Sequence, residues 1–139
     1  MRFCANHWQM LRDEVKRTGL DALVPEGGEA AVRAMASEFT DGPTIDNFDP
    51  LMMAHNMIWA RAMHDIKSMY GQNPLMLMAD ADEHPDWACP VCALLWCHAE
   101  HDRLCKQENC NYPKKFDWET ELINGSLVEV QKRWEGMKP

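Results

Sequence analysis

The 139-residue chain has a formal net charge of −8, and 46% of its residues are hydrophobic. This apolar content excludes a disordered chain, and the acidic balance argues against nucleic acid as a general partner, because affinity for phosphates comes mainly from Lys and Arg. No stretch approaches the ~20 apolar residues of a membrane span. The length predicts a single domain, residues 1–139, that is large enough to bury a core of its own.

The first two predicted helices cover residues 6–18 and 28–39. Asn6 is a candidate N-cap for the first helix, and Gly19 follows its last turn as a stop signal. Apolar residues at helical spacing predict the second helix.

The third predicted helix is the clearest in the chain. Asp49 as N-cap and Pro50 at the first helical position mark its start, and Gly71 lies beyond its end. Its apolar stripe consists of Leu51, Ala54, Ile58, Ala62, Ile66 and Met69. At about 20 residues such a helix is roughly 30 Å long, enough to span a small domain.

Two further helices are predicted in the second half of the chain. A short one starts near Pro90, and the last opens at Asp117 with Gly125 in its interior, where we expect a close packing contact. Its apolar stripe consists of Ile123, Leu127, Val130 and Trp134. No strand alternation occurs, so the sequence predicts an all-α, compact domain of about five helices.

The cysteines are concentrated in one stretch. Five of the six lie between Cys89 and Cys110, and the sixth, Cys4, lies three positions before His7. The N-terminus lacks the apolar run of a signal peptide, so we expect a protein made in a reducing cytoplasm. Thiolate metal ligands are therefore expected in preference to disulfides, and the chemistry favours zinc.

The first predicted zinc site combines Cys4 and His7 with Cys89 and Cys92. Each pair has the two-residue gap that lets both side chains reach one ion about 2.3 Å away. The 81 residues between His7 and Cys89 exceed the length of an autonomous zinc finger. Metal would thus join the N-terminus to the middle of the chain.

A second zinc site is predicted further along the cysteine-rich stretch. Its ligands are His101, Cys105 and Cys110, with either Cys97 or His98 as the fourth. Cys97 is the preferred ligand, because thiolate binds zinc strongly and no cysteine is then left over. The alternative is a three-ligand site beside which Cys97 and His98 are packed or exposed.

Three enzyme interpretations and an iron–sulfur cluster compete with a structural zinc site. Cys89–Cys92 resembles a redox dithiol but lacks the βαβ context, and His98–His101 places its histidines and glutamate out of register for a zinc hydrolase. His55 with His64 faintly suggests a nuclease. An iron–sulfur cluster would combine Cys97 with the Cys89–Cys92 pair. The histidines favour zinc, and a non-enzymatic protein is expected.

Three segments, Phe3–Trp8, Asp49–Asn56 and Cys89–Cys110, resemble small bacteriophage-encoded proteins with zinc-finger-like cysteines. The resemblance implies a viral origin and carries no established activity. It matches seven predicted ligands, namely Cys4, His7, Cys89, Cys92, His101, Cys105 and Cys110. Cys97 and His98 fall in an unmatched stretch, which leaves the fourth ligand of the second site open.

The resulting functional hypothesis is a non-enzymatic, zinc-stabilised protein that acts through protein–protein contacts. It would be a phage virion component or a factor that binds a host protein, located in the cytoplasm of the producing cell or in the virion. The alternative is a nucleic-acid-associated zinc finger or an acidic decoy of a DNA-binding protein, although Lys106, Lys114 and Lys115 offer only a small basic face for direct binding.

Overall fold

The computed structural model describes residues 3–28, 30, 32, 48–71, 89–104 and 118–138, with the backbone alone for residues 100–104. Its elements are the α-helices α1 (Ala5–Arg17), α3 (Pro50–Tyr70), α5 (Pro90–Leu104) and α6 (Trp118–Met137), together with the 3₁₀ helix η1 (Leu20–Leu23). These ranges contain no strand, which confirms the all-α class. They hold four α-helices where the sequence predicted about five. Of the predicted helix 28–39, only Gly28, Ala30 and Val32 are described, and all three are helical.

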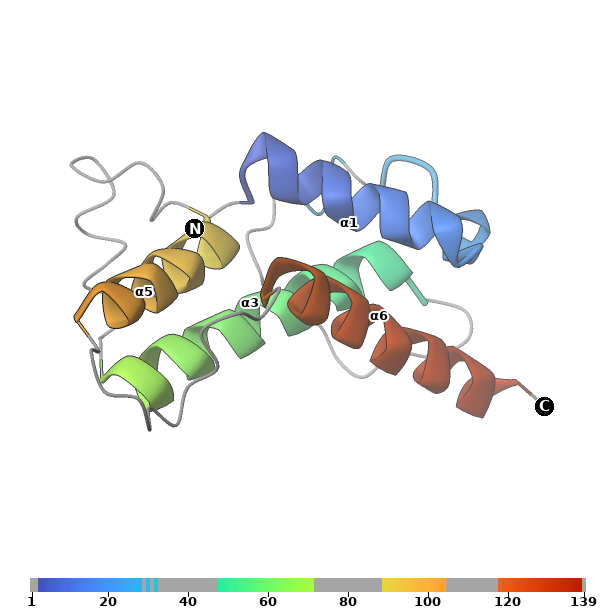
Figure 1. Ribbon diagram of the computed structural model, residues 1–139. Coiled ribbons are helices and arrows are strands. Elements are labelled where there is room, and N and C mark those ends of the chain that lie inside the picture. The colour runs from blue at the N-terminus through green and yellow to red at the C-terminus, as the bar shows by residue number, and fades with distance from the viewer. Residues whose placement is uncertain are drawn as a thin grey trace.

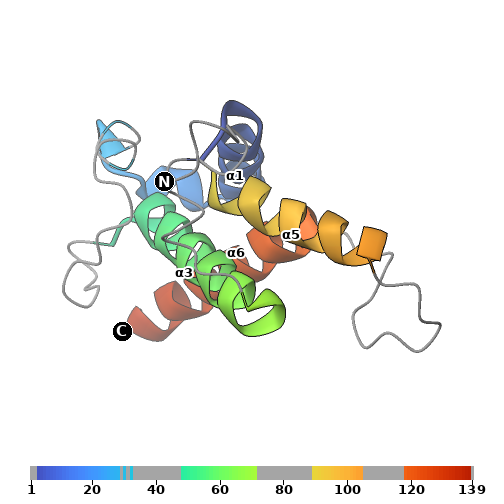
Figure 2. The same ribbon diagram turned by 90° about the vertical axis from the view of Figure 1, so that its left-hand side faces the viewer.

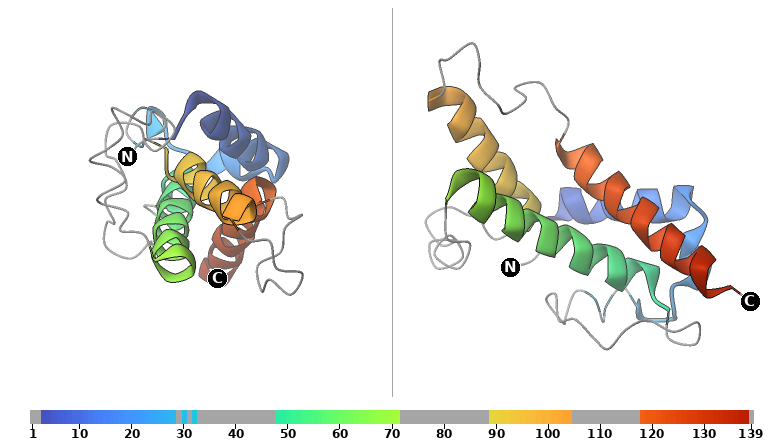
Figure 3. Two further views of the ribbon diagram at one scale, coloured as in Figure 1. Left: turned by 60° about the vertical axis from the view of Figure 1, so that its left-hand side comes forward. Right: turned by 90° about the horizontal axis from the view of Figure 1, so that it is seen from below.

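Helix α3 is central and contacts α1, η1, α5 and α6. Figure 1 shows α5 beside the C-terminal half of α3, while α6 runs in roughly the opposite direction beside its N-terminal half. Near the N-terminal end of α3 the rings of Phe48 and Trp134 pack against each other at an angle of 45°, with centroids 4.9 Å apart. Figure 2 and Figure 3 show that the N-terminal ends of α1 and α5 lie close together.

The end signals of α3 act as the sequence predicted. The Asp49 carboxylate accepts hydrogen bonds from the backbone N–H groups of Leu51 and Met52, at 3.0 and 3.1 Å. Gly71 ends the helix with φ +64°, a left-handed conformation that favours glycine. The Asp49 N-cap and the Gly71 C-cap both satisfy backbone groups that a helix end leaves unpaired.

The core consists of the predicted helical stripes. The stripe residues Leu51, Ala54, Ile58, Ala62 and Ile66 of α3 and Ile123, Leu127 and Val130 of α6 are buried. The predicted Met69 and Trp134 are only partly buried, and Leu122, which was not predicted, joins the core. Helix α1 adds Trp8, Leu11 and Val15, which lie three or four positions apart. Residues at this spacing share one helix face. The three helices therefore each have a continuous apolar surface that packs against neighbouring helices.

Two details differ from the sequence predictions. Helix α1 begins at Ala5 with Cys4 as its N-cap, so the assignment of Asn6 as N-cap was wrong. A Cβ placed on Gly125 would meet no atom of another element within 4 Å in the described chain, so the close packing contact expected there is also wrong. Gly125 lies instead on the exposed face of α6.

Candidate metal centre

Cys4 and His7 are held by the start of α1. Cys4 is the N-cap, and its sulfur accepts a hydrogen bond from the backbone N–H of His7 at 3.4 Å. His7 lies in the first helical turn and is buried. The pair therefore projects from a helix N-terminus, where the free N–H groups and the helix dipole favour negative charge on a thiolate.

Cys89 and Cys92 are placed in the same way by α5. Cys89 directly precedes the helix, and its carbonyl accepts the backbone N–H of Ala93 at 2.9 Å. Its sulfur accepts a hydrogen bond from the backbone N–H of Cys92. Each pair thus consists of a capping cysteine and a second donor three residues later.

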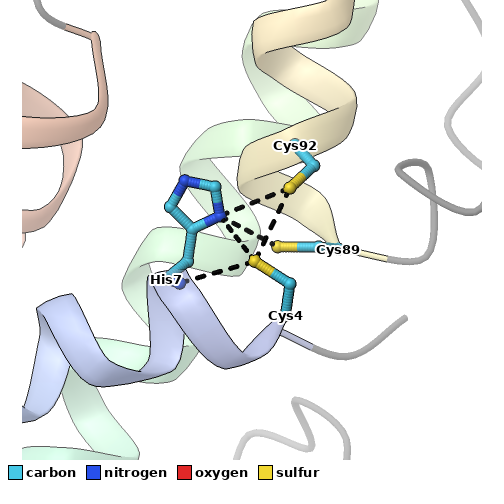
Figure 4. Close-up of side chains that lie close together, drawn as sticks. All are labelled: Cys4, His7, Cys89 and Cys92. Atoms are coloured by element: carbon cyan, nitrogen blue, oxygen red, sulfur yellow. Dashed lines mark hydrogen bonds between the residues drawn. The ribbon is translucent and has the colours of Figure 1, made fainter.

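The two helix ends bring the four donors into one cluster, which Figure 4 shows. The Nδ1 atom of His7 lies 3.0 Å from the sulfur of Cys4, 3.3 Å from that of Cys92 and 3.6 Å from that of Cys89. The sulfurs of Cys4 and Cys92 are 3.7 Å apart. All four donor atoms lie within 4.8 Å of one another.

The four individual separations, 3.0 to 3.7 Å, are close to the edges of a single-ion tetrahedron. With ion–sulfur distances of about 2.3 Å and ion–nitrogen distances of about 2.0 Å, tetrahedral geometry places two sulfurs about 3.8 Å apart and a sulfur about 3.5 Å from a nitrogen. The four cysteines that the structure describes, including all three in this cluster, form no disulfide. The donor set of three thiols and one imidazole can therefore hold a metal ion.

Electrostatics within the cluster favour a cation. A hydrogen bond from the Cys92 thiol lowers the pKa of Cys89, and the same bond raises the pKa of Cys92, so the two sulfurs share a proton. Burial lowers the pKa of His7, but hydrogen bonding to Cys89 and the charges of Cys89 and Glu119 outweigh burial and raise it above its usual value. Because thiol and imidazole ligands must lose their protons to bind a metal, metal binding here would release protons.

The rings of Phe3, Trp8 and His55 pack against one another. The ring of His55 stacks on Phe3, with centroids 4.7 Å apart, and meets Trp8 edge to face at 6.3 Å. Burial lowers the pKa of His55, so this imidazole is neutral at physiological pH. His55 is buried beside the cluster, whereas His64 is exposed, so the faint nuclease pairing of these two residues gains no support.

Glu119 is a residue near the cluster that the sequence interpretation missed. Its carboxylate Oε2 lies 3.4 Å from Nε2 of His7, on the opposite side of the imidazole from the sulfurs. Glu119 stands in the first turn of α6, 112 positions after His7. No local sequence signal distinguishes it from the neighbouring Glu121, because the contact depends on how α6 packs against α1.

The predicted second site is described only in part. Cys97 is buried in the core, with 3% of its surface exposed, and it belongs to no metal-ligand group among the described residues. His98 stacks on Trp118 at 4.0 Å and pairs through Nδ1 with the hydroxyl of Tyr70. The other expected ligands, namely the side chain of His101 and residues Cys105 and Cys110, lie outside the described part. The second site stays a prediction.

The geometry of the four-donor cluster also bears on the iron–sulfur interpretation. An iron–sulfur cluster was expected to add Cys97 to the Cys89–Cys92 pair, but the structure completes that pair with Cys4 and His7. Cys97 packs in the hydrophobic core. Three thiols and one imidazole at the spacing of a single-ion tetrahedron favour a mononuclear site.

Neither the helices nor the comparisons with known proteins assign this chain to a class or family. Within the described ranges, no helix has the length and apolar character needed to cross a membrane. Comparison with known protein families, with curated proteins and with solved structures finds no match to this chain.

Proposed function

We propose that Cys4, His7, Cys89 and Cys92 bind one structural zinc ion. The observation that carries the proposal is the convergence of four donor atoms within 4.8 Å, with individual separations close to those of a tetrahedron. Tetrahedral sulfur and nitrogen donors are the preferred environment of Zn²⁺. Calcium and magnesium are disfavoured, because they require oxygen ligands.

A structural role is favoured over a catalytic one. Four protein donors complete the coordination of zinc, whereas catalytic sites keep a position for water or substrate. His7 and Cys89 are also buried. We therefore propose a non-enzymatic protein whose metal holds the N-terminus of α1 against the N-terminus of α5.

The physical effect of the metal follows from chain connectivity. The unfolded chain must bring together two pairs that are separated by 81 residues, so the site forms only when the helices pack. Binding free energy is then also folding free energy. Zinc would specify how α1 and α5 meet, in a domain that already has a hydrophobic core.

The proposed biological role is contact with other proteins, as a bacteriophage virion component or a host-directed factor. This part rests on the sequence resemblance and on the formal charge of −8. Three thiolates around one Zn²⁺ add about one further negative charge. Such a charge disfavours direct binding to DNA or RNA, and retention on a DNA column at moderate salt would contradict it.

The test is the metal content of the purified full-length chain, measured by elemental mass spectrometry together with native mass. At least one zinc per chain is expected, and Cys92→Ser and His7→Ala should each lose one. Cys97→Ala is the matched control for the first site, because Cys97 lies outside the four-donor cluster. Iron, or no loss of zinc in either ligand variant, would overturn the proposal.

The same measurement counts the ions. Two zinc ions in the wild-type chain, with one lost in Cys97→Ala, would establish the predicted second site with His101, Cys105 and Cys110. One zinc that Cys97→Ala retains would leave the cluster of Cys4, His7, Cys89 and Cys92 as the site.

A further inference from the structure

We infer that Glu119 positions His7 for metal binding by accepting a hydrogen bond from its Nε2–H. The inference rests on the proposed zinc site and adds to it a residue outside the ligand set. It also links the metal to a third helix, α6, which carries no ligand in the described chain.

The two ring nitrogens of His7 face opposite environments. Nδ1 lies 3.0 to 3.6 Å from the three sulfurs. Nε2 is buried, and 3.4 Å away lies the carboxylate of Glu119, at ion-pair distance but beyond a well-formed hydrogen bond. Among the described residues, no hydrogen-bond partner satisfies this buried nitrogen.

Metal binding fixes which nitrogen carries the proton. A neutral imidazole has one N–H, and coordination through Nδ1 uses the lone pair of that atom, so the proton must be on Nε2. A buried N–H needs an acceptor. Glu119 supplies a charged one, and a modest closing movement of its side chain brings Oε2 to hydrogen-bond distance.

The geometry excludes Glu119 as a direct ligand. Its carboxylate lies on the Nε2 side of the ring, and it is not part of the four-donor cluster. A carboxylate that accepts from a ligating histidine orients the ring and increases the electron density on the ligating nitrogen. This role requires proximity to His7 alone.

Helix α6 holds Glu119 in place through its buried face. Glu119 lies three and four positions before the buried Leu122 and Ile123, so all three residues share one side of the helix. Glu121 is exposed, by contrast, although it stands in the same first turn. The side chain of Glu119 is 34% exposed, which shows that it reaches the cluster from the edge.

The experiment compares zinc affinity in full-length variants by competition with a chromophoric chelator. Glu119→Ala should bind zinc 10- to 100-fold more weakly, the usual effect of removing such a partner. Glu119→Gln should lose less affinity, because its amide oxygen still accepts a hydrogen bond. Glu121→Ala and Glu121→Gln are matched controls that remove the same charge from the same turn and should bind as the wild type does.

A second measurement reports on the ring itself. In ¹⁵N spectra of the zinc-loaded protein, His7 should be the tautomer with its proton on Nε2, and this proton should exchange slowly with water. Exchange should be faster in Glu119→Ala and unchanged in Glu121→Ala.

Two outcomes overturn the inference. One is wild-type affinity and exchange in Glu119→Ala, and the other is an equal loss of affinity in the Glu119 and Glu121 variants, which would indicate a general effect of charge. Either result leaves the zinc site itself intact. A wild-type chain that holds no zinc on Cys4, His7, Cys89 and Cys92 would instead overturn the proposed function.

Discussion

Nδ1 of His7 lies 3.3 Å from the sulfur of Cys92, although the two residues are 85 positions apart in the chain. This contact joins the first turn of α1 to the first turn of α5. The elements between them include α3, which packs against both helices. The metal centre and the hydrophobic core therefore stabilise the same arrangement by different means.

Removing the metal should destabilise the folded protein. A ligand present at 1,000 times its Kd contributes about 4 kcal/mol, which corresponds to a decrease in Tm of roughly 10–20 °C for a domain of this size. The measurement is thermal unfolding followed by circular dichroism, with and without a zinc chelator.

Cys92→Ser serves as the control for chelation. Without chelator it should unfold at a lower temperature than the wild type, and chelator should shift its unfolding less than it shifts that of the wild type, because its first site no longer holds the ion. An unchanged wild-type unfolding curve in excess chelator would contradict a stabilising metal.

Cys97 should react slowly with iodoacetamide in the folded protein. Burial raises its thiol pKa from 9.0 to about 11, so the fraction of reactive thiolate at pH 8 is about 100-fold lower than for an ordinary cysteine. The rate should rise with pH and reach half of its maximum at about pH 11, where half of the thiol is ionised. Mass spectrometry of digested protein measures this rate at each cysteine.

The same labelling distinguishes burial from coordination. Cys4 and Cys92, which are partly exposed, should be protected with zinc and labelled once zinc is removed. Protection of Cys97 should be the same in both conditions. Zinc-dependent protection of Cys97 would instead place it in the second predicted metal site.

Gly125→Ala should stabilise the protein by up to about 1 kcal/mol, because alanine has the higher helix propensity and restricts the unfolded chain. Gly125 is exposed in the interior of α6, and the added methyl group meets no atom of another element within 4 Å in the described chain. Urea unfolding gives the change in free energy. Gly136→Ala is the matched control and should have a smaller effect, because Gly136 lies next to the helix end. Destabilisation by Gly125→Ala would indicate a contact at this face.

Asp49→Ala should lower the free energy of unfolding by about 1 kcal/mol, because it removes the acceptor for the N–H groups of Leu51 and Met52. Asp49→Ser should retain most of the stability, since serine is also a good N-cap. Asp13→Ala, at an exposed position in α1, is the control and should change stability by less than about 0.5 kcal/mol. Equal effects of Asp49→Ala and Asp49→Ser would argue against a capping role.

The helix signals in the sequence were reliable where local interactions decide the structure. Asp49 and Gly71 act at the two ends of α3 as predicted. The N-cap of α1 was assigned wrongly, because Asn6 is a more common capping residue than Cys4. Cys4 takes the position in the structure because the helix starts where its sulfur can accept from His7 and face α5.

The sequence by itself determined the helical class and the two ligand pairs, Cys4 with His7 and Cys89 with Cys92, because helical periodicity and metal-ligand spacing are properties of neighbouring residues. The tertiary structure alone decided that the two pairs meet in one cluster, that Cys97 packs in the core and that Glu119 reaches His7. All three depend on how helices far apart in sequence pack together. Residue types and spacing do not encode that packing, which is set by the shapes of the apolar faces that α3 joins.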